Sequence, residues 1–231
     1  GRDASHLELG RPLAVALPAD AAAVADTIGL CARHGVPFVP RGGGTGLSGG
    51  ALPPAGAVVV ATARLDAVGA VDAAGRRVTA GPGALNEAIG RAARAHGLHF
   101  APDPSSQAAA TLGGNVAENA GGPHTLKVGV TLHHLRRLEW VDPAGRRWHS
   151  GRGLAWERGL DLLGLLAGSE GTLGFVTAAD LRLVPAPRAT ATLLALFPRL
   201  DDATAAVVAL MGQGVLPAAV ELIDQDRKSV V

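Results

Sequence analysis

The stretch Pro40-Arg41-Gly42-Gly43-Gly44-Thr45-Gly46-Leu47-Ser48-Gly49-Gly50 decides how this chain is interpreted. It follows a short apolar run, Val36-Pro37-Phe38-Val39, which is typical of a strand that ends in a turn. Glycines this dense cost backbone entropy, and the usual reason is positive-φ geometry or close approach to a bulky group. Consecutive amides without Cβ atoms can also turn inward and bind an anion such as a phosphate. The flanking strands favour a ligand-binding loop over a flexible linker.

Part of this stretch also satisfies the dinucleotide-binding pattern G-x-G-x-x-G, from Gly44 to Gly49, with Asp66 about twenty residues further on. That pattern must open a helix, whereas the proline-containing segment 51–56 cannot start one well. The next element, at 57–61, reads as an apolar strand. A Gly-Lys-Ser/Thr ending is missing as well, so the sequence excludes a nicotinamide fingerprint and a nucleotide P-loop.

Composition limits the class of protein. The 231 residues are 48% hydrophobic, which predicts a globular chain with a sizeable core. The formal net charge of +1 gives no reason to expect a nucleic acid partner. No apolar stretch is long enough for a transmembrane segment. The single cysteine, Cys31, favours a reducing compartment and a buried thiol, so we expect a cytoplasmic protein, with peripheral membrane association as an alternative.

Hydrophobic periodicity predicts a chain of helices and strands that opens with a parallel β-α-β unit. The expected helices lie at 19–34, 84–96 and 201–211. The expected strands lie at 11–18, 36–39, 57–61, 65–68, 77–81, 135–141, 147–149 and 175–184. The composition changes after Pro185 and Pro187, where we expect a separate unit to begin. The abrupt start at Gly1 and the unclosed end at 225–231 suggest a piece of a longer protein.

Two further glycine clusters, at 111–122 and 168–174, carry interleaved Ser, Thr and Asn residues and lie near apolar runs. Another unusual loop, Pro102-Asp103-Pro104-Ser105-Ser106-Gln107, follows the first glycine stretch and precedes both of these clusters in the sequence. One such loop could be only a tight turn. Several together predict one extended ligand held mostly by backbone amides, for which a diphosphate joined to a planar ring is well suited.

These motifs, in this order and spacing, carry a resemblance to a known family. The segments are 40–50, Ala-Pro-Asp-Pro-Ser-Ser at 101–106, Gly-Gly-Asn-Val-Ala-Glu-Asn-Ala-Gly-Gly at 113–122 and Gly-Ser-Glu-Gly-Thr-Leu-Gly at 168–174. Together they resemble the FAD-binding domain of the vanillyl-alcohol-oxidase/PCMH flavoproteins, in the branch that holds D-lactate dehydrogenases and the D subunit of glycolate oxidase. The resemblance implies a PCMH-type FAD-binding domain at 1–186. Its α+β subdomains would span about 1–70 and 71–186, and a C-terminal α+β substrate domain would begin at 187–231.

The resemblance also implies a set of FAD-binding residues. In the first loop they are Pro40, Arg41, Gly42, Gly43, Gly44, Thr45, Gly46 and Ser48, around the diphosphate. Beside the diphosphate and flavin they are Pro102, Asp103, Ser105 and Ser106. Along the ribityl and phosphate region they are Thr111, Gly114, Asn115, Asn119 and Gly121. Closing over the adenine side they are Glu170, Gly171, Thr172, Leu173, Gly174 and Val176.

The first loop departs from some relatives in a telling way. Relatives that link flavin covalently through this loop carry histidine where this chain has Thr45, so the resemblance implies non-covalent FAD. A role in the loop itself is favoured for His124 over a role beside the flavin. His133 and His134 are adjacent, and on a strand they would point to opposite faces. We therefore expect no metal site in this chain.

The resemblance implies oxidation of a D-2-hydroxy acid, of the glycolate or D-lactate type, to the 2-oxo acid by an FAD-linked oxidase. In such enzymes the acid/base and metal-binding histidines lie in the C-terminal domain, so the chain alone is expected to bind FAD without turnover. The catalytic residues and the electron acceptor are therefore unidentified. An alternative is a non-catalytic FAD-binding subunit that needs partner subunits. The same fold in enolpyruvyl reductases or alkyl-transfer enzymes is a third possibility, which the Pro-Asp-Pro-Ser-Ser and Asn-Ala-Gly-Gly segments disfavour.

Overall fold

The computed structural model describes residues 3–5, 7, 10–151 and 159–223. Its first sheet has three strands in the order β1-β3-β2, and both pairs are parallel. These strands are β1 (Ala14–Ala16), β2 (Phe38–Arg41) and β3 (Val58–Ala61). Helix α1 (Ala21–Arg33) joins β1 to β2 and begins at Asp20, whose carboxylate accepts a hydrogen bond from the Ala23 N–H at 2.8 Å. The parallel β-α-β opening is confirmed, although β3 lies between its two strands.

The second sheet is antiparallel, with the strand order β4-β8-β6-β7. Its strands are β4 (Arg77–Ala80), β6 (Leu135–Val141), β7 (Arg147–Gly151) and β8 (Phe175–Arg182). A separate pair joins β5 (Leu98–His99) to β9 (Val184–Pro185). The expected 135–149 hairpin is confirmed as β6 and β7. The strand expected at 65–68 is wrong, because this segment makes only an isolated bridge between Val68 and Ala80.

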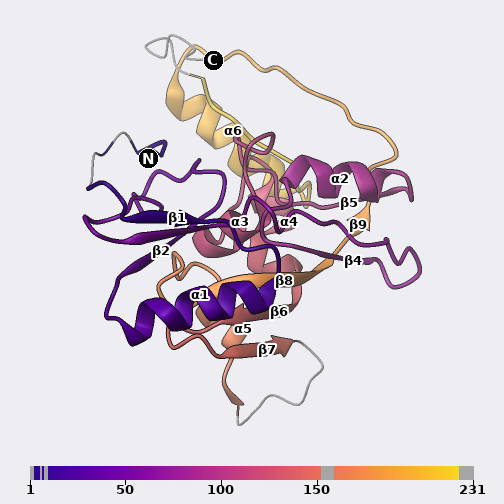
Figure 1. Cartoon of the computed structure of the whole chain (residues 1–231). Helices are drawn as coiled ribbons and strands as arrows, with labels where there is room; N and C mark the ends of the chain where they lie inside the picture. Colours follow the sequence, from indigo (N-terminus) through magenta and orange to yellow (C-terminus); the bar gives the residue numbers. More distant parts are fainter. Residues whose placement is uncertain (1–2, 6, 8–9, 152–158, 224–231) are drawn as a thin grey trace.

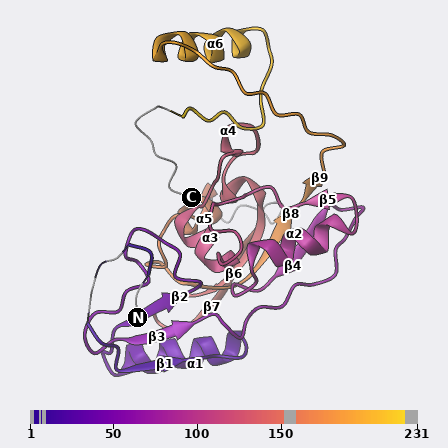
Figure 2. The same ribbon diagram turned by 90° about the horizontal axis from the view of Figure 1, so that it is seen from above.

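Helices cover the second sheet on one side, as Figures 1 and 2 show. They are α2 (Asn86–Arg94), α3 (Leu112–Glu118) and α5 (Leu162–Leu166). Their apolar side chains form the main core with Leu138 and Trp140 of β6. A second core joins Val24 and Ile28 of α1 to Val141 and Phe175 of the same sheet. Neighbouring residues Trp140 and Val141 thus belong to different cores, as the alternation of side chains along a strand requires.

Two short elements follow α3. They are α4 (Thr125–Val128) and the 3₁₀ helix η1 (Thr131–His134). His133 and His134 therefore lie in a 3₁₀ helix and not on a strand. His134 is buried, and its Nε2 hydrogen-bonds the Val128 carbonyl at 2.9 Å. His133 is exposed, and its Nδ1 accepts a hydrogen bond from the Val130 N–H at 3.0 Å.

The C-terminal part of the described chain stands apart from this body. Helix α6 (Leu200–Gly212) confirms the helix expected at 201–211. None of its residues is buried, and Figures 1 and 2 show it separated from both sheets. The end of the expected C-terminal unit, 224–231, lies outside the described residues. Within the described chain, no helix combines the length and apolar character needed to cross a bilayer.

Candidate functional site

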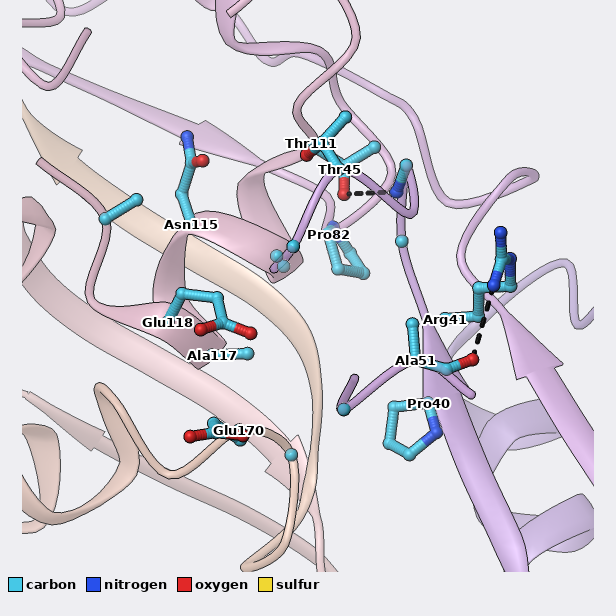
Figure 3. Close-up of a pocket in the computed structure, with 18 of the residues that line it drawn as sticks. Pro40, Arg41, Thr45, Ala51, Pro82, Thr111, Asn115, Ala117, Glu118 and Glu170 are labelled. Atoms are coloured by element: carbon cyan, nitrogen blue, oxygen red, sulfur yellow. Dashed lines mark hydrogen bonds between the residues drawn. The ribbon is translucent and has the colours of Figure 1, made fainter. Parts of the chain in front are cut away.

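A cavity of about 400 Å³ lies between three segments. They are the glycine stretch at 40–50, α3 with the residues on either side of it (110–120), and the loop before β8 (168–174). Figure 3 shows these walls, with Pro40, Arg41 and Thr45 on the glycine stretch and Ala51 directly after it. Most of the expected FAD-binding residues line this cavity. They are Pro40, Arg41, Gly42, Gly43, Gly44, Thr45, Gly46, Ser48, Ser106, Thr111, Gly114, Asn115, Glu170, Gly171, Gly174 and Val176.

The other expected FAD-binding residues are not in the cavity lining. They are Pro102, Asp103, Ser105, Asn119, Gly121, Thr172 and Leu173. Several of them make contacts within the protein. Asn119 caps the C-terminus of α3 at a φ of 49°, and its Oδ1 accepts a hydrogen bond from the Leu132 N–H at 2.9 Å. The Thr172 hydroxyl donates to the Ser169 carbonyl at 2.6 Å.

The backbone of the glycine stretch offers hydrogen-bond donors to the cavity region. Among the described residues, the N–H groups of Gly44, Thr45, Gly46 and Ser48 donate no hydrogen bond to the protein. Backbone N–H groups that are left without a partner need one from solvent or from a ligand. Successive free amides at a cavity wall suit the oxygen atoms of a diphosphate. The residues present therefore fit the diphosphate of FAD.

Two glycines of this stretch are required by the protein's own packing. A Cβ at Gly42 would lie 2.3 Å from the Thr111 Oγ1, and one at Gly43 would lie 2.2 Å from the Ala109 carbonyl oxygen. The Gly43 N–H also donates to the Thr111 Oγ1 at 3.2 Å, as Figure 3 shows. Thr111 thus holds the glycine stretch against the start of α3.

Arg41 braces the same stretch from the other side. Its Nη1 donates to the Ala51 carbonyl at 3.2 Å, which ties the two ends of the glycine stretch together (Figure 3). Gly44 has a φ of 71°, and a Cβ there would lie 2.5 Å from the Arg41 Nη2. Position 44 therefore favours glycine for two reasons, because the left-handed backbone and the neighbouring guanidinium both disfavour a side chain there.

Two buried amides fix the floor of the site. Asn115 is only 3% exposed, and its Nδ2 donates to the Asn86 Oδ1 at 2.9 Å. The Asn86 Nδ2 in turn donates to the Pro102 carbonyl at 2.9 Å. This chain of hydrogen bonds joins α3, α2 and the 101–106 loop. Asn86 was not among the predicted residues, because nothing near it in sequence marks a partner in α3.

A second residue that was not predicted is Glu118, the last residue of α3. It lines the cavity, and its Oε2 accepts a hydrogen bond from the Ser48 hydroxyl at 3.2 Å. Glu118 follows Asn115 by one helical turn, a spacing that places both residues on one side of a helix. The spacing of Asn115 and Glu118 becomes informative only when 112–118 is known to be a helix.

The Nδ1 of His124 and the Oδ2 of Asp103 are in close hydrogen-bonding contact outside the cavity lining. His99 lies near enough to interact electrostatically with both, and burial lowers the pKa of its ring. Among the residues that the structure describes, no group of His, Cys, Asp or Glu side chains could hold a metal ion.

Curated relatives cover nearly the whole chain. The glycolate oxidase subunit GlcD of Escherichia coli (strain K12) is 43% identical over 214 residues, which are 93% of this chain and 43% of that protein. GlcD of Bacillus subtilis (strain 168) is 38% identical over 99% of this chain and 49% of its own length. The D-lactate dehydrogenase of Archaeoglobus fulgidus is 37% identical over 91% of this chain and 47% of its own length. The chain thus spans under half the length of these relatives.

Solved structures show the same fold. Two crystal forms of alkyldihydroxyacetonephosphate synthase superpose with TM-scores of 0.75 and 0.76 at 24% and 25% identity. They cover 88% and 89% of this chain, and 40% and 38% of the synthase chains. The expected α+β fold of PCMH-type flavoproteins is therefore confirmed.

Two family models account for most of the chain. One, described as the C-terminal domain of FAD linked oxidases, matches residues 186–231. The other, described as the FAD binding domain, matches residues 12–151 and thus contains the glycine stretch, Thr111 and Glu118. The second match covers more than half of the chain, and FAD is the cofactor that the family binds. The chain belongs to the FAD binding domain family.

Proposed function

We propose that this chain is the FAD-binding part of an oxidoreductase that converts a D-2-hydroxy acid, of the glycolate or D-lactate type, to the 2-oxo acid. The observation that carries the proposal is the cavity between the glycine stretch, α3 and the loop before β8. The names of the relatives, glycolate oxidase subunit and D-lactate dehydrogenase, support the substrate class.

In this proposal the chain's own residues bind and orient the cofactor. The amides of Gly44, Thr45, Gly46 and Ser48 would hold the diphosphate, while Thr111 keeps the stretch in place. Thr45 offers no imidazole for a covalent bond to flavin, so we propose that FAD is bound non-covalently. Bound FAD supplies a two-electron acceptor, and the protein supplies position and electrostatics.

We further propose a domain boundary at 186, with FAD binding by 1–186 and a substrate domain that begins at 187. The family models at 12–151 and 186–231 support this division. The burial pattern supports it as well, since no described residue from 184 to 223 is buried. The catalytic base and the substrate contacts would then belong to the C-terminal domain.

A second candidate is a non-catalytic FAD-binding subunit that works only with partner chains. The word subunit in the name of the GlcD relatives favours it. The test is turnover of D-lactate and glycolate by the complete protein with an artificial electron acceptor. Turnover without any partner supports the first proposal and removes the second. A complete protein that contains FAD but oxidises neither substrate contradicts the first proposal.

We also propose a cytoplasmic location, with peripheral membrane association as the alternative.

A further inference from the structure

Glu118 and its neighbour Glu170 place carboxylates in a cavity whose cofactor is an anion. Both residues line the cavity, and Figure 3 shows them on the wall that also carries Ala117. The Glu170 N–H donates to the Ala117 carbonyl at 2.8 Å, so the two segments are joined at their backbones. Like charges repel, and the diphosphate of FAD therefore cannot bind at these carboxylates. They need hydrogen-bond donors instead.

The position of Glu118 is set by the glycine stretch that it faces. The Ser48 hydroxyl donates to its Oε2 at 3.2 Å. Its Oε1 lies 3.2 Å from the place that a Cβ on Gly46 would occupy. The Glu118 carboxylate thus lies against the glycine stretch at Gly46 and Ser48, two residues whose N–H groups are part of the proposed diphosphate site.

FAD carries hydroxyl groups on both sides of its diphosphate, on the ribityl chain and on the adenosine ribose. A carboxylate only accepts hydrogen bonds, and a sugar hydroxyl beside a diphosphate is a matching donor. A diphosphate held by the amides of Gly46 and Ser48 would bring its adjoining sugar hydroxyls toward Glu118. Ser48 engages one carboxylate oxygen, which leaves Oε1 for a sugar hydroxyl.

We propose that the Glu118 carboxylate accepts hydrogen bonds from sugar hydroxyls of bound FAD, and that Ser48 orients it. This inference rests on FAD binding in the cavity. It makes Glu118 a determinant of cofactor selection, because a ligand without hydroxyls beside its phosphates leaves the carboxylate unpaired.

The test is isothermal titration of the protein with FAD, FMN and ADP, for the wild type and the variants Glu118→Ala and Glu118→Gln. FMN shares the ribityl chain with FAD, whereas ADP shares the ribose. Hydrogen bonds to charged groups predict a loss of FAD affinity of about tenfold or more for Glu118→Ala. Glu118→Gln keeps an acceptor oxygen and should lose less. A parallel loss for FMN assigns the ribityl hydroxyls, and a parallel loss for ADP assigns the ribose hydroxyls.

The matched control is Glu87→Ala, which removes an exposed carboxylate from the first turn of α2, outside the cavity lining. It should leave the dissociation constant for FAD unchanged. Glu118→Ala with wild-type or tighter FAD binding overturns the inference, and tighter binding would show that Glu118 only repels the diphosphate. Wild-type protein that binds no FAD contradicts FAD binding in the cavity itself and removes the role of Glu118 with it.

Discussion

Gly43 and Gly46 lie in one loop, yet each is a glycine for a different reason. A Cβ at Gly43 would lie 2.2 Å from the Ala109 carbonyl oxygen, so packing within the protein excludes a side chain. A Cβ at Gly46 would meet only the Glu118 carboxylate, with its nearest oxygen at 3.2 Å. At the scale of single residues, the glycine stretch therefore combines a part that packs against the protein with a part that lines the cavity.

This difference predicts different outcomes for two alanine substitutions. Gly43→Ala forces a Cβ against fixed backbone and should lower the free energy of unfolding by about 1–3 kcal/mol. Gly46→Ala should keep the wild-type stability, because the Glu118 side chain can move, but should weaken FAD binding. Urea denaturation without FAD and titration with FAD measure the two effects. Wild-type stability of Gly43→Ala would contradict the packing argument.

The buried pair of Asn86 and Asn115 gives a second prediction at this scale. Asn86→Ala leaves the Pro102 carbonyl and the Asn115 amide without their partners. Each unsatisfied buried group costs about 1–3 kcal/mol, so the variant should be clearly less stable in urea denaturation. Glu87→Ala, the exposed next residue, should stay within about 0.5 kcal/mol of the wild type. Equal stability of the two variants would show that the hydrogen bonds from Asn115 to Asn86 and from Asn86 to Pro102 do not stabilise the fold.

At the scale of elements, the tip of the β6–β7 hairpin packs closely against α1. A Cβ at Gly145 would lie 2.7 Å from the Gly29 Cα and 2.9 Å from the Ala25 carbonyl oxygen. Gly145 also has a φ of 84°. This contact brings α1, which joins strands of the first sheet, against the second sheet, and so supports the relative placement of the cavity walls.

Gly145→Ala should therefore lower the free energy of unfolding by more than the cost of a left-handed backbone conformation alone. The control is Gly35→Ala, at a φ of 62° with no atom within 4 Å of the added Cβ. The control should cost only the left-handed strain of roughly 1–2 kcal/mol. Gly145→Ala adds steric overlap, which is worth about 1–3 kcal/mol more. If thermal denaturation gives the same loss for both variants, helix and hairpin are not in contact.

The same hairpin predicts a dependence of stability on pH. Burial tends to raise the pKa of Asp142, but hydrogen bonds from the Arg146 backbone, the Trp148 indole and the Arg146 side chain outweigh it and lower the pKa to about 2. The pKa of Asp142 in the folded protein lies below the usual 3.8, so the ionised carboxylate stabilises the fold. This stabilisation is fully present at a pH above 3.8 and is lost as the pH falls toward 2. Asp142→Asn should lower stability at pH 7 and lose less on acidification. An unchanged acid profile would argue against the role of this carboxylate.

The elements differ in how well the sequence predicted them. α1, the β6–β7 hairpin and α6 follow from periodicity and turn residues, and all three were predicted. α3 was missed because Gly113 and Gly114 have low helix propensity. It forms because Leu112 and Val116 are fully buried in the core, a contribution that comes from tertiary packing. The insertion of β3 between β1 and β2 also depends on tertiary pairing, which local patterns do not contain.

At the scale of the whole molecule, the cavity joins segments that are far apart in sequence. Motifs with unusual glycine content predicted these segments, and most of the expected residues line the cavity. The residues that were missed, Asn86 and Glu118, act through partners in other segments, and no local pattern marks such partners. We propose that the cavity between the glycine stretch, α3 and the loop before β8 binds FAD without a covalent bond.

Reconstitution with FAD tests this proposal. The protein is incubated with FAD, freed of unbound cofactor by gel filtration, and examined by absorbance spectroscopy before and after denaturation with acid. We expect a flavin spectrum with one FAD per chain before acid treatment, and full release of the flavin into the supernatant after it. Protein that stays colourless after incubation would contradict FAD binding, and flavin that stays with the precipitated protein would contradict non-covalent binding.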